Sequence, residues 1–136
     1  MTVVVCTDTR GGMRFAGRRT SRDREMLSDL SRMAEGRRLY CRPYSEKLLT
    51  AAGLAPTVCE GALSVATEGD IVFIEDCPLR PHLDRISSLV IYCWGEAYPY
   101  DASLDLVPSE DGLHLASTEE FPGHSHALIR KEIYRK

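Results

Sequence analysis

The chain has 136 residues, of which 43% are hydrophobic and 27% are charged, and its formal net charge is −3. This length suits one domain, and the composition is typical of a globular protein and excludes a disordered chain. No apolar run approaches the roughly 20 residues that a membrane-spanning helix needs, and the start of the chain lacks the basic segment of a signal peptide. We therefore expect one domain over residues 1–136, located in the cytoplasm and without a membrane partner.

Charge is distributed unevenly along the sequence. Residues 10–42 contain ten arginines and four acidic residues, whereas residues 43–136 contain seven basic and fifteen acidic residues. A basic first third on an acidic remainder predicts a local anion site. The negative net charge argues against a nucleic-acid-binding surface that covers the whole molecule.

The first third of the sequence predicts a strand, a loop and a helix. The β-branched run at 2–7 is typical of a buried strand, and residues 13–19 are expected to form an irregular loop. Thr20 or Ser21 is expected to cap the following helix, with Asp23 as the returning acid of a capping box. Apolar residues then recur at helical spacing, so this helix is expected to bury one face.

The rest of the chain continues this alternation and then ends in strands. The segments predicted as strands are rich in apolar or β-branched residues and lie at 38–41, 57–59, 71–74, 89–94, 113–116 and 128–134. Helical segments are expected at 46–52, at 62–67 as a short helix or turn, and from Pro81 onward. The last two strands are expected to pair antiparallel, because no helical pattern links them. The order predicts an α/β fold, a mostly parallel sheet flanked by helices with a C-terminal antiparallel hairpin.

The strongest local feature is an arginine-rich stretch before a helix N-terminus, formed by Arg18, Arg19, Thr20, Ser21 and Arg22. Free N–H groups and the helix dipole favour an anion there, and arginines add forked donors for phosphate or carboxylate. The partner is either a small anionic ligand or the acidic remainder of the chain, which would form surface salt bridges. Arg42 and Ser45 are a second candidate phosphate cradle at the start of another helix, where Ser45 could instead be an ordinary helix cap.

Asp23 is the candidate catalytic acid. It lies three residues before Met26 and therefore shares the core-facing side of the helix, at the rim of the sheet. The alternative is a purely structural role in the capping box. Glu25 and Asp29 are expected to face solvent more than Asp23 does.

No metal site is predicted from the histidines and cysteines. The spacing of His124 and His126 is too loose for a specific metal site, and both are expected to be exposed in a hairpin loop. The five cysteines form no Cys-x-x-Cys pair and are interpreted as reduced core thiols. Glu75 and Asp76 follow a central strand, where they could bind a cation or an amine, or Asp76 could cap a turn.

Several of these segments together resemble the dihydrofolate reductase family. The strand at 2–7 and the run Asp8-Thr9-Arg10-Gly11-Gly12-Met13 are similar to the family's first strand and its glycine-containing loop. Residues 39–45 resemble its phosphate-holding strand, loop and helix, residues 89–101 its late strand and Phe-Pro segment, and residues 113–135 its terminal hairpin. The resemblance spans nearly the whole chain and implies the dihydrofolate reductase fold, with the helix at 21–34 in the place of the acid-bearing helix.

The sequence departs from this family where the cofactor would bind. Glu75 and Asp76 stand where the reductases carry Gly-Gly, and two carboxylates repel phosphate and block close approach of the backbone. Arg42 replaces a glycine after the second strand, and the Leu-Pro-Trp segment before the catalytic helix is missing. No cofactor is therefore predicted, with NADPH as the alternative, and these departures argue against NADPH binding in the family's manner and against standard reductase activity.

The chain also resembles small uncharacterised bacterial proteins that carry an Arg-Arg-x-Ser-Arg/Gln-Asp stretch, here residues 18–23. Some of those proteins are labelled ribonuclease Z. The His-x-His-x-Asp-His run that holds two zinc ions in ribonuclease Z is absent from this sequence, so that label is not supported. An RNA-binding or RNA-processing protein and a non-catalytic interaction module are the alternatives to a small-ligand-binding protein, and the sequence leaves open whether the chain is an enzyme.

Overall fold

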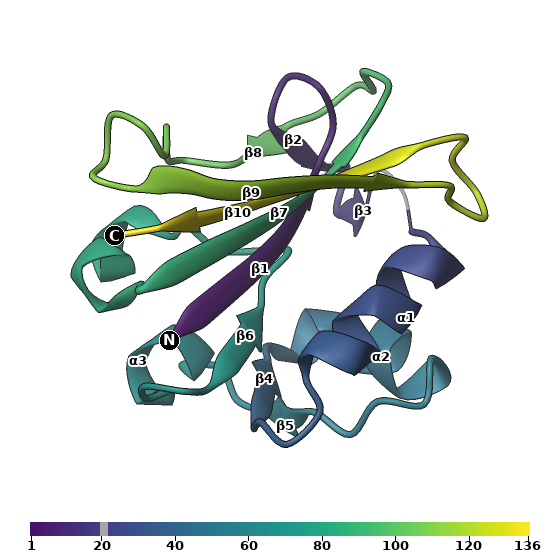
Figure 1. The fold of residues 1–136 in the computed structure, drawn as a ribbon. Helices are drawn as coiled ribbons and strands as arrows, with labels where there is room; N and C mark the ends of the chain where they lie inside the picture. Colours follow the sequence, from purple (N-terminus) through teal and green to yellow (C-terminus); the bar gives the residue numbers. More distant parts are fainter. Residues whose placement is uncertain (20–21) are drawn as a thin grey trace.

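The computed structural model describes residues 1–19 and 22–136. In this part of the chain the main sheet has the strand order β5-β4-β6-β1-β7-β10-β9 (Figure 1). Its strands in chain order are β1 Thr2–Thr7, β4 Leu39–Cys41, β5 Thr57–Val58, β6 Ile71–Phe73, β7 Ser88–Trp94, β9 His114–Phe121 and β10 Ile129–Arg135. Neighbouring strands from β5 to β7 are parallel, and β10 is antiparallel to both β7 and β9. The α/β fold with a mostly parallel sheet and a C-terminal antiparallel hairpin is thereby confirmed, and β9 extends well beyond the predicted segment.

Helices cover both faces of the main sheet. The helical elements are α1 Arg24–Met33, α2 Glu46–Ala51 and α3 Ala62–Val65, with the 3-10 helices η1 Pro43–Ser45 and η2 Arg80–Arg85. Figure 1 shows α1 and α2 on one face of the sheet and α3 on the other. The helix that the sequence predicts from Pro81 is the 3-10 helix η2. Within residues 1–19 and 22–136, no helix has both the length and the apolar character that crossing a membrane requires.

The side chains of β1 alternate between two hydrophobic cores, which explains why this strand is apolar throughout. Val3 and Val5 pack in the core on the α3 side, which also contains Leu63. Val4 packs in the core on the α1 side together with Leu30. Each of these three valines is fully buried, and burial of such a side chain contributes about 1.5–3 kcal/mol. A central strand of this kind fixes where the loops that follow its carboxyl end must lie.

The prediction of an irregular loop over 13–19 was wrong. The segment forms the hairpin of β2 Gly12–Phe15 and β3 Arg18–Arg19, which joins β8 Ala102–Ser103 in a separate small sheet. Ala16 and Gly17 reverse the chain with positive φ values of 52° and 75°. The pairing partner β8 comes from a distant part of the chain, so local sequence patterns did not reveal this sheet.

The start of α1 differs from the predicted capping box. The helix begins at Arg24, and Asp23 is itself the N-cap residue, whose carboxylate accepts a hydrogen bond from the backbone N–H of Glu25 at 2.8 Å. Asp23 therefore occupies the position that the sequence analysis gives to Thr20 or Ser21. Those two residues lie outside the described part of the chain.

Asp29 does not face solvent as predicted. It is buried on α1, where Nζ of Lys131 lies 2.8 Å from its carboxylate and the hydroxyl of Tyr92 donates to it. Burial by itself would raise the pKa of Asp29, but the hydrogen bonds from Lys131 and Tyr92 outweigh burial and lower it. The charge partner on β10 explains why a carboxylate is stable on this face of the helix.

Candidate functional site

The carboxyl ends of β1, β4 and β6 meet at one edge of the main sheet, and the segments that follow these strands converge there. β1 leads into the β2–β3 hairpin, β4 leads through η1 into α2, and β6 leads to Glu75 and Asp76. The N-terminal end of α1 lies at the same edge (Figure 1). Such an edge is the usual place for a ligand site in an open α/β sheet.

An ion pair between Arg19 and Glu75 lies at this edge. Nε of Arg19 donates to Oε1 of Glu75 at 2.8 Å, and Nη2 donates to Oε2 at 2.9 Å. The hydroxyl of Ser45 donates to the same Oε2 at 2.7 Å. The hydrogen bond to Glu75 raises the pKa of Arg19, although partial burial acts in the opposite direction. The forked geometry fixes the orientation of the guanidinium group.

Arg42 and Ser45 also contact the chain's own carboxylates. Nε of Arg42 lies 3.1 Å from the carboxylate of Asp76, and its Nη2 lies 3.6 Å from that of Glu60. Ser45 occupies the N-cap position of α2, but its hydroxyl makes no capping bond and donates to Glu75 instead. The two acids after β6, Glu75 and Asp76, are therefore paired with Arg19 and Arg42.

A hollow of about 450 Å³ lies beside the Arg19–Glu75 pair, and we refer to it as the arginine hollow. It is lined by Gly17, Arg18, Arg19, Arg22 and Tyr44. The ring of Tyr44 lies 4.9 Å from the guanidinium carbons of both Arg14 and Arg19, and its hydroxyl donates to the carbonyl of Gly17 at 3.0 Å. Cation–π contacts of this kind stabilise a cation next to an aromatic ring. They hold Arg14 and Arg19 beside Tyr44 in η1.

The arginines of the hollow differ in their partners. Among the described residues, Arg18 and Arg22 form no ion pair, whereas Arg19 pairs with Glu75. Nε of Arg14 is buried and has no hydrogen-bond partner in the same part of the chain. The hollow therefore contains guanidinium groups that form no ion pair with a carboxylate of residues 1–19 and 22–136.

The carboxylate of Asp23 lies at the N-terminus of α1 and is saturated with donors. Besides the N–H of Glu25, it accepts from the backbone N–H groups of His124, Ser125 and His126 at 2.8, 2.7 and 3.1 Å. Nδ1 of His126 lies 3.0 Å from its Oδ2. Burial would raise the pKa of Asp23, but these hydrogen bonds lower it strongly. Asp23 is thus held as an anion that ties α1 to the loop between β9 and β10.

The two histidines of this loop have different environments. His126 is buried, and its ring stacks on Trp94 with a centroid separation of 4.1 Å and an interplanar angle of 8°. The prediction that it is exposed was wrong, because Trp94 and Asp23 reach it from distant parts of the sequence. His124 is exposed as predicted and lies 3.2 Å from a guanidinium nitrogen of Arg24. In residues 1–19 and 22–136, no group of three or more His, Cys, Asp or Glu side chains is arranged to hold a metal ion.

A larger cleft of about 790 Å³ lies between α1, α2 and the loop at residues 124–125. Its apolar lining comes from the two helices and consists of Leu27, Leu48, Ala51 and Ala52. Arg22, Arg24 and His124 add basic or polar groups. Arg22 lines both this cleft and the arginine hollow, so the two cavities are adjacent.

The structure brings together part of the residue set that the sequence indicates. Arg18, Arg19 and Arg22 line one hollow, whereas Arg42 and Ser45 lie outside its lining. Sequence reasoning did not find Tyr44, whose position directly after Pro43 at a helix start was its only signal. It also did not find the pairing of Arg19 with Glu75, because those residues are 56 positions apart.

Comparison with solved structures agrees with this architecture. A dihydrofolate reductase from Enterococcus faecalis, solved in complex with NADP(H) and the compound RAB-propyl, superposes with a TM-score of 0.69. The match covers 98% of this chain and 94% of that chain. This chain has a dihydrofolate reductase-like fold. The sequence identity of 10% limits the likeness to the dihydrofolate reductase-like fold itself. No protein-family model matches the sequence, and no curated protein matches it.

Proposed function

We propose that this protein binds a small anionic ligand, one that bears a phosphate or carboxylate group, in the arginine hollow. The observation that carries the proposal is the convergence of Arg18, Arg19 and Arg22 around one hollow, next to Tyr44. Guanidinium groups match phosphate and carboxylate oxygens with paired hydrogen bonds. A ligand of this class would balance the charge of Arg18 and Arg22, which have no carboxylate partner among the described residues.

The Arg19–Glu75 pair supports this proposal through preorganisation. Glu75 holds two nitrogens of Arg19, so the guanidinium group loses little further freedom when a ligand arrives. The contact of Arg19 with the ring of Tyr44 restrains it from another side. Side chains fixed in this way lower the entropic cost of binding.

The ligand in this proposal is held by side chains and not by the N-terminus of α1. Asp23 already supplies a negative charge at that terminus and accepts the N–H of Glu25. A second anion at the same point would be repelled. We assign Asp23 a positioning role, in which it holds residues 124–126 against the cleft beside the arginine hollow. Proton transfer by Asp23 stays a prediction.

Standard NADPH-dependent reductase activity is not part of this proposal. The reductase with the similar fold was solved with NADP(H), but here Glu75 and Asp76 follow β6 and are paired with Arg19 and Arg42. A dinucleotide approaching this point would meet two carboxylates and would have to displace two ion pairs.

Thermal unfolding with candidate ligands tests the proposal directly. Phosphate compounds, mononucleotides, folates, NADPH and short RNA would each be added to the purified protein. A ligand at 100 times its dissociation constant stabilises the folded state by about 2.7 kcal/mol, which raises the unfolding midpoint by several degrees. We expect such a rise with a small phosphate or carboxylate compound, and we expect Arg18→Ala and Arg22→Ala to reduce it.

Arg130→Ala is the matched control, because it removes the same charge from an exposed strand position that does not line the hollow. A rise that is equal in the wild-type protein and in both hollow variants would contradict the proposed site. A rise with RNA alone, steeply reduced by salt, would favour the RNA-binding alternative. No rise with any compound would favour an interaction module.

A further inference from the structure

A second basic hollow lies at the opposite end of the main sheet, where the parallel strands begin. It has a volume of about 560 Å³ and is lined by the second half of α1, the loop after it, the starts of β1 and β7, and strand β10. Its basic side chains are Arg32, Arg37, Lys131 and Arg135. Among the described residues that line it, the acidic ones are Asp29 and Glu68. We call it the strand-start hollow.

The acidic side chains balance only part of this positive charge. Asp29 lies 2.8 Å from Nζ of Lys131 and 3.4 Å from Nη2 of Arg32, so its single charge is shared between two cations. Glu68 is 86% exposed and lies 3.8 Å from the amino group of Met1. Strong neutralisation of the remaining cations by Glu68 is not expected at such exposure.

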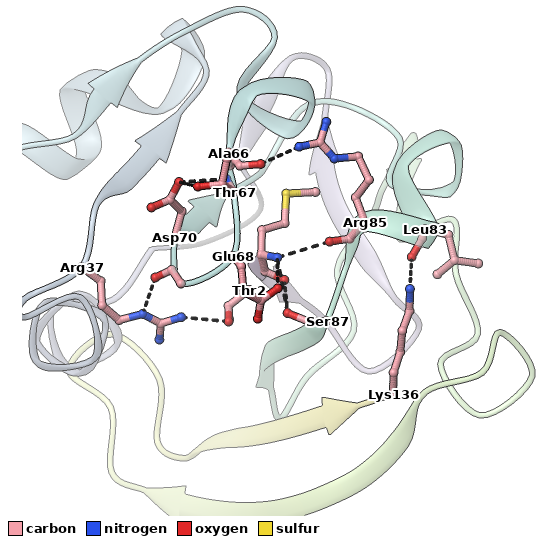
Figure 2. A network of polar contacts seen from close by, with 12 residues as sticks. Thr2, Arg37, Ala66, Thr67, Glu68, Asp70, Leu83, Arg85, Ser87 and Lys136 are labelled. Carbon is pink, nitrogen blue, oxygen red and sulfur yellow. Dashed lines mark hydrogen bonds and ion pairs between the residues drawn. The ribbon is translucent and has the colours of Figure 1, made fainter.

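Arg37 is held by hydrogen bonds but forms no ion pair with a carboxylate in the part of the chain that the structure describes. Its Nε donates to the carbonyl of Gly69 at 2.8 Å, and its Nη2 donates to the hydroxyl of Thr2 at 3.1 Å. Figure 2 shows these two bonds anchoring the guanidinium group between the loop and the start of β1. Both acceptors are neutral. Arg135 likewise forms no ion pair with any residue in 1–19 and 22–136.

We propose that the strand-start hollow binds a small phosphate-bearing molecule independently of the arginine hollow. The two guanidinium groups without carboxylate partners, Arg37 and Arg135, supply the charge. The hydroxyls of Thr2 and Ser88 also line the hollow and can donate to phosphate oxygens. Val90, Ile133 and Met33 form the apolar part of the lining, and an apolar wall strengthens charge–charge attraction.

The dipole of α1 explains only some of the basic residues. The C-terminal end of a helix favours cations, which accounts for Arg32 in the last turn and is compatible with Arg37 shortly after it. Lys131 and Arg135 come from β10, and side chains alternate along a strand. Two basic residues on the face of β10 that points to the hollow are therefore a separate feature, which the helix dipole does not require.

The test is an NMR titration of the whole chain with inorganic pyrophosphate, which reports each site separately. Binding to the strand-start hollow is expected to shift the amide signals of Ser88, Lys131 and Arg135. Binding to the arginine hollow shifts those of Gly17 and Arg19. Arg135→Ala is expected to weaken binding at the strand-start hollow about tenfold, as loss of one charge-assisted hydrogen bond does.

Arg130→Ala is the matched control, because it removes an arginine from the same strand but from the opposite face, where its Nε lies 3.3 Å from Glu132. Arg135→Gln provides a second variant if Arg135→Ala does not fold. The inference is overturned if Ser88, Lys131 and Arg135 do not shift, or if binding there is unaffected by either variant at Arg135. Shifts at Ser88 without shifts at Gly17 and Arg19 would support the strand-start hollow and would show that the arginine hollow does not bind pyrophosphate.

Discussion

At the residue scale, the carboxylate of Asp23 connects parts of the chain that are 101 positions apart, the start of α1 and the loop at His124. It caps the helix and accepts three further backbone N–H groups from that loop. Its side chain is fully buried, so the hydrogen bonds are not exchanged with water. A single residue thereby holds one wall of the α1–α2 cleft in place.

Asp23→Asn is expected to lower the free energy of unfolding by about 3 kcal/mol, because the amide lacks the charge that strengthens these bonds and turns one acceptor into a donor. Urea unfolding would measure the loss. Asp84→Asn, at an exposed position on η2, is the matched control and should leave stability unchanged. Equal stability of the wild-type protein and Asp23→Asn would show that the loop is held by other contacts.

Acidification is expected to destabilise the protein by protonating Asp23. Folding lowers the pKa of Asp23, so its contribution is fully present above the unfolded value of about 3.9 and is lost as the pH falls toward the lower folded value. The unfolding midpoint of the wild-type protein is therefore expected to fall between about pH 5 and pH 2. Asp23→Asn should show a smaller fall over this range. Parallel pH profiles for the two proteins would contradict this assignment.

At the scale of elements, the β2–β3 hairpin places Arg18 and Arg19 at the arginine hollow. The turn of this hairpin requires positive φ angles, which are 52° at Ala16 and 75° at Gly17. Glycine adopts such angles without the steric cost that a side chain brings. The carbonyl of Gly17 also accepts the hydroxyl of Tyr44, so the turn is tied to η1.

Gly17→Ala is expected to destabilise the hairpin by about 1 kcal/mol, since a Cβ there meets open space but the backbone angle is strained. A lower unfolding midpoint and a weaker anion response would reveal this change. Gly61→Ala is the control, because Gly61 has an ordinary negative φ of −95° and its added Cβ also meets open space. Similar effects of the two substitutions would contradict the argument from backbone strain.

The same hairpin is a part of the fold that local sequence patterns could not predict, in contrast to the long central strands. The long apolar runs at 2–7, 71–74 and 89–94 correspond to β1, β6 and β7, because a strand buried on both faces must be apolar throughout. β2 and β3 are short, and their third partner β8 follows far along the chain. Short strands stabilised by distant pairing leave no periodic pattern.

The candidate site, like the fold, could be predicted from the sequence only in part. The arginine-rich stretch at the start of α1 is visible in the sequence because charge is a local property. Whether each arginine faces a ligand or an internal acid depends on long-range contacts, such as those between Arg19 and Glu75 and between Arg42 and Asp76. The burial of Asp29 likewise depends on Lys131 from β10, which no helical pattern predicts.

At the scale of the whole molecule, a dihydrofolate reductase-like fold is combined with acidic residues after β6. Glu75 and Asp76 lie at the carboxyl end of a central strand and are paired with Arg19 and Arg42. Because fold alone does not determine function, the chemistry of this edge decides which ligands the fold accepts. We expect two carboxylates at this point to disfavour a dinucleotide.

Removal of both acids should therefore raise the affinity for NADPH. Glu75→Gly combined with Asp76→Gly eliminates the negative charge and lets a pyrophosphate group approach the backbone, while Arg19 and Arg42 are released to bind it. Isothermal titration of NADPH is expected to show tighter binding to this double variant than to the wild-type protein.

Glu75→Gln combined with Asp76→Asn separates electrostatic repulsion from steric exclusion, because it removes the charge and keeps the bulk of the side chains. Intermediate affinity would mean that both repulsion and steric exclusion act, whereas affinity equal to the glycine variant would mean that repulsion alone excludes the cofactor. The explanation fails if neither double variant binds NADPH more tightly than the wild-type protein does. In that case a feature other than these two acids, such as the ring of Tyr44 in contact with Arg14 and Arg19, would have to exclude the cofactor from this edge of the sheet.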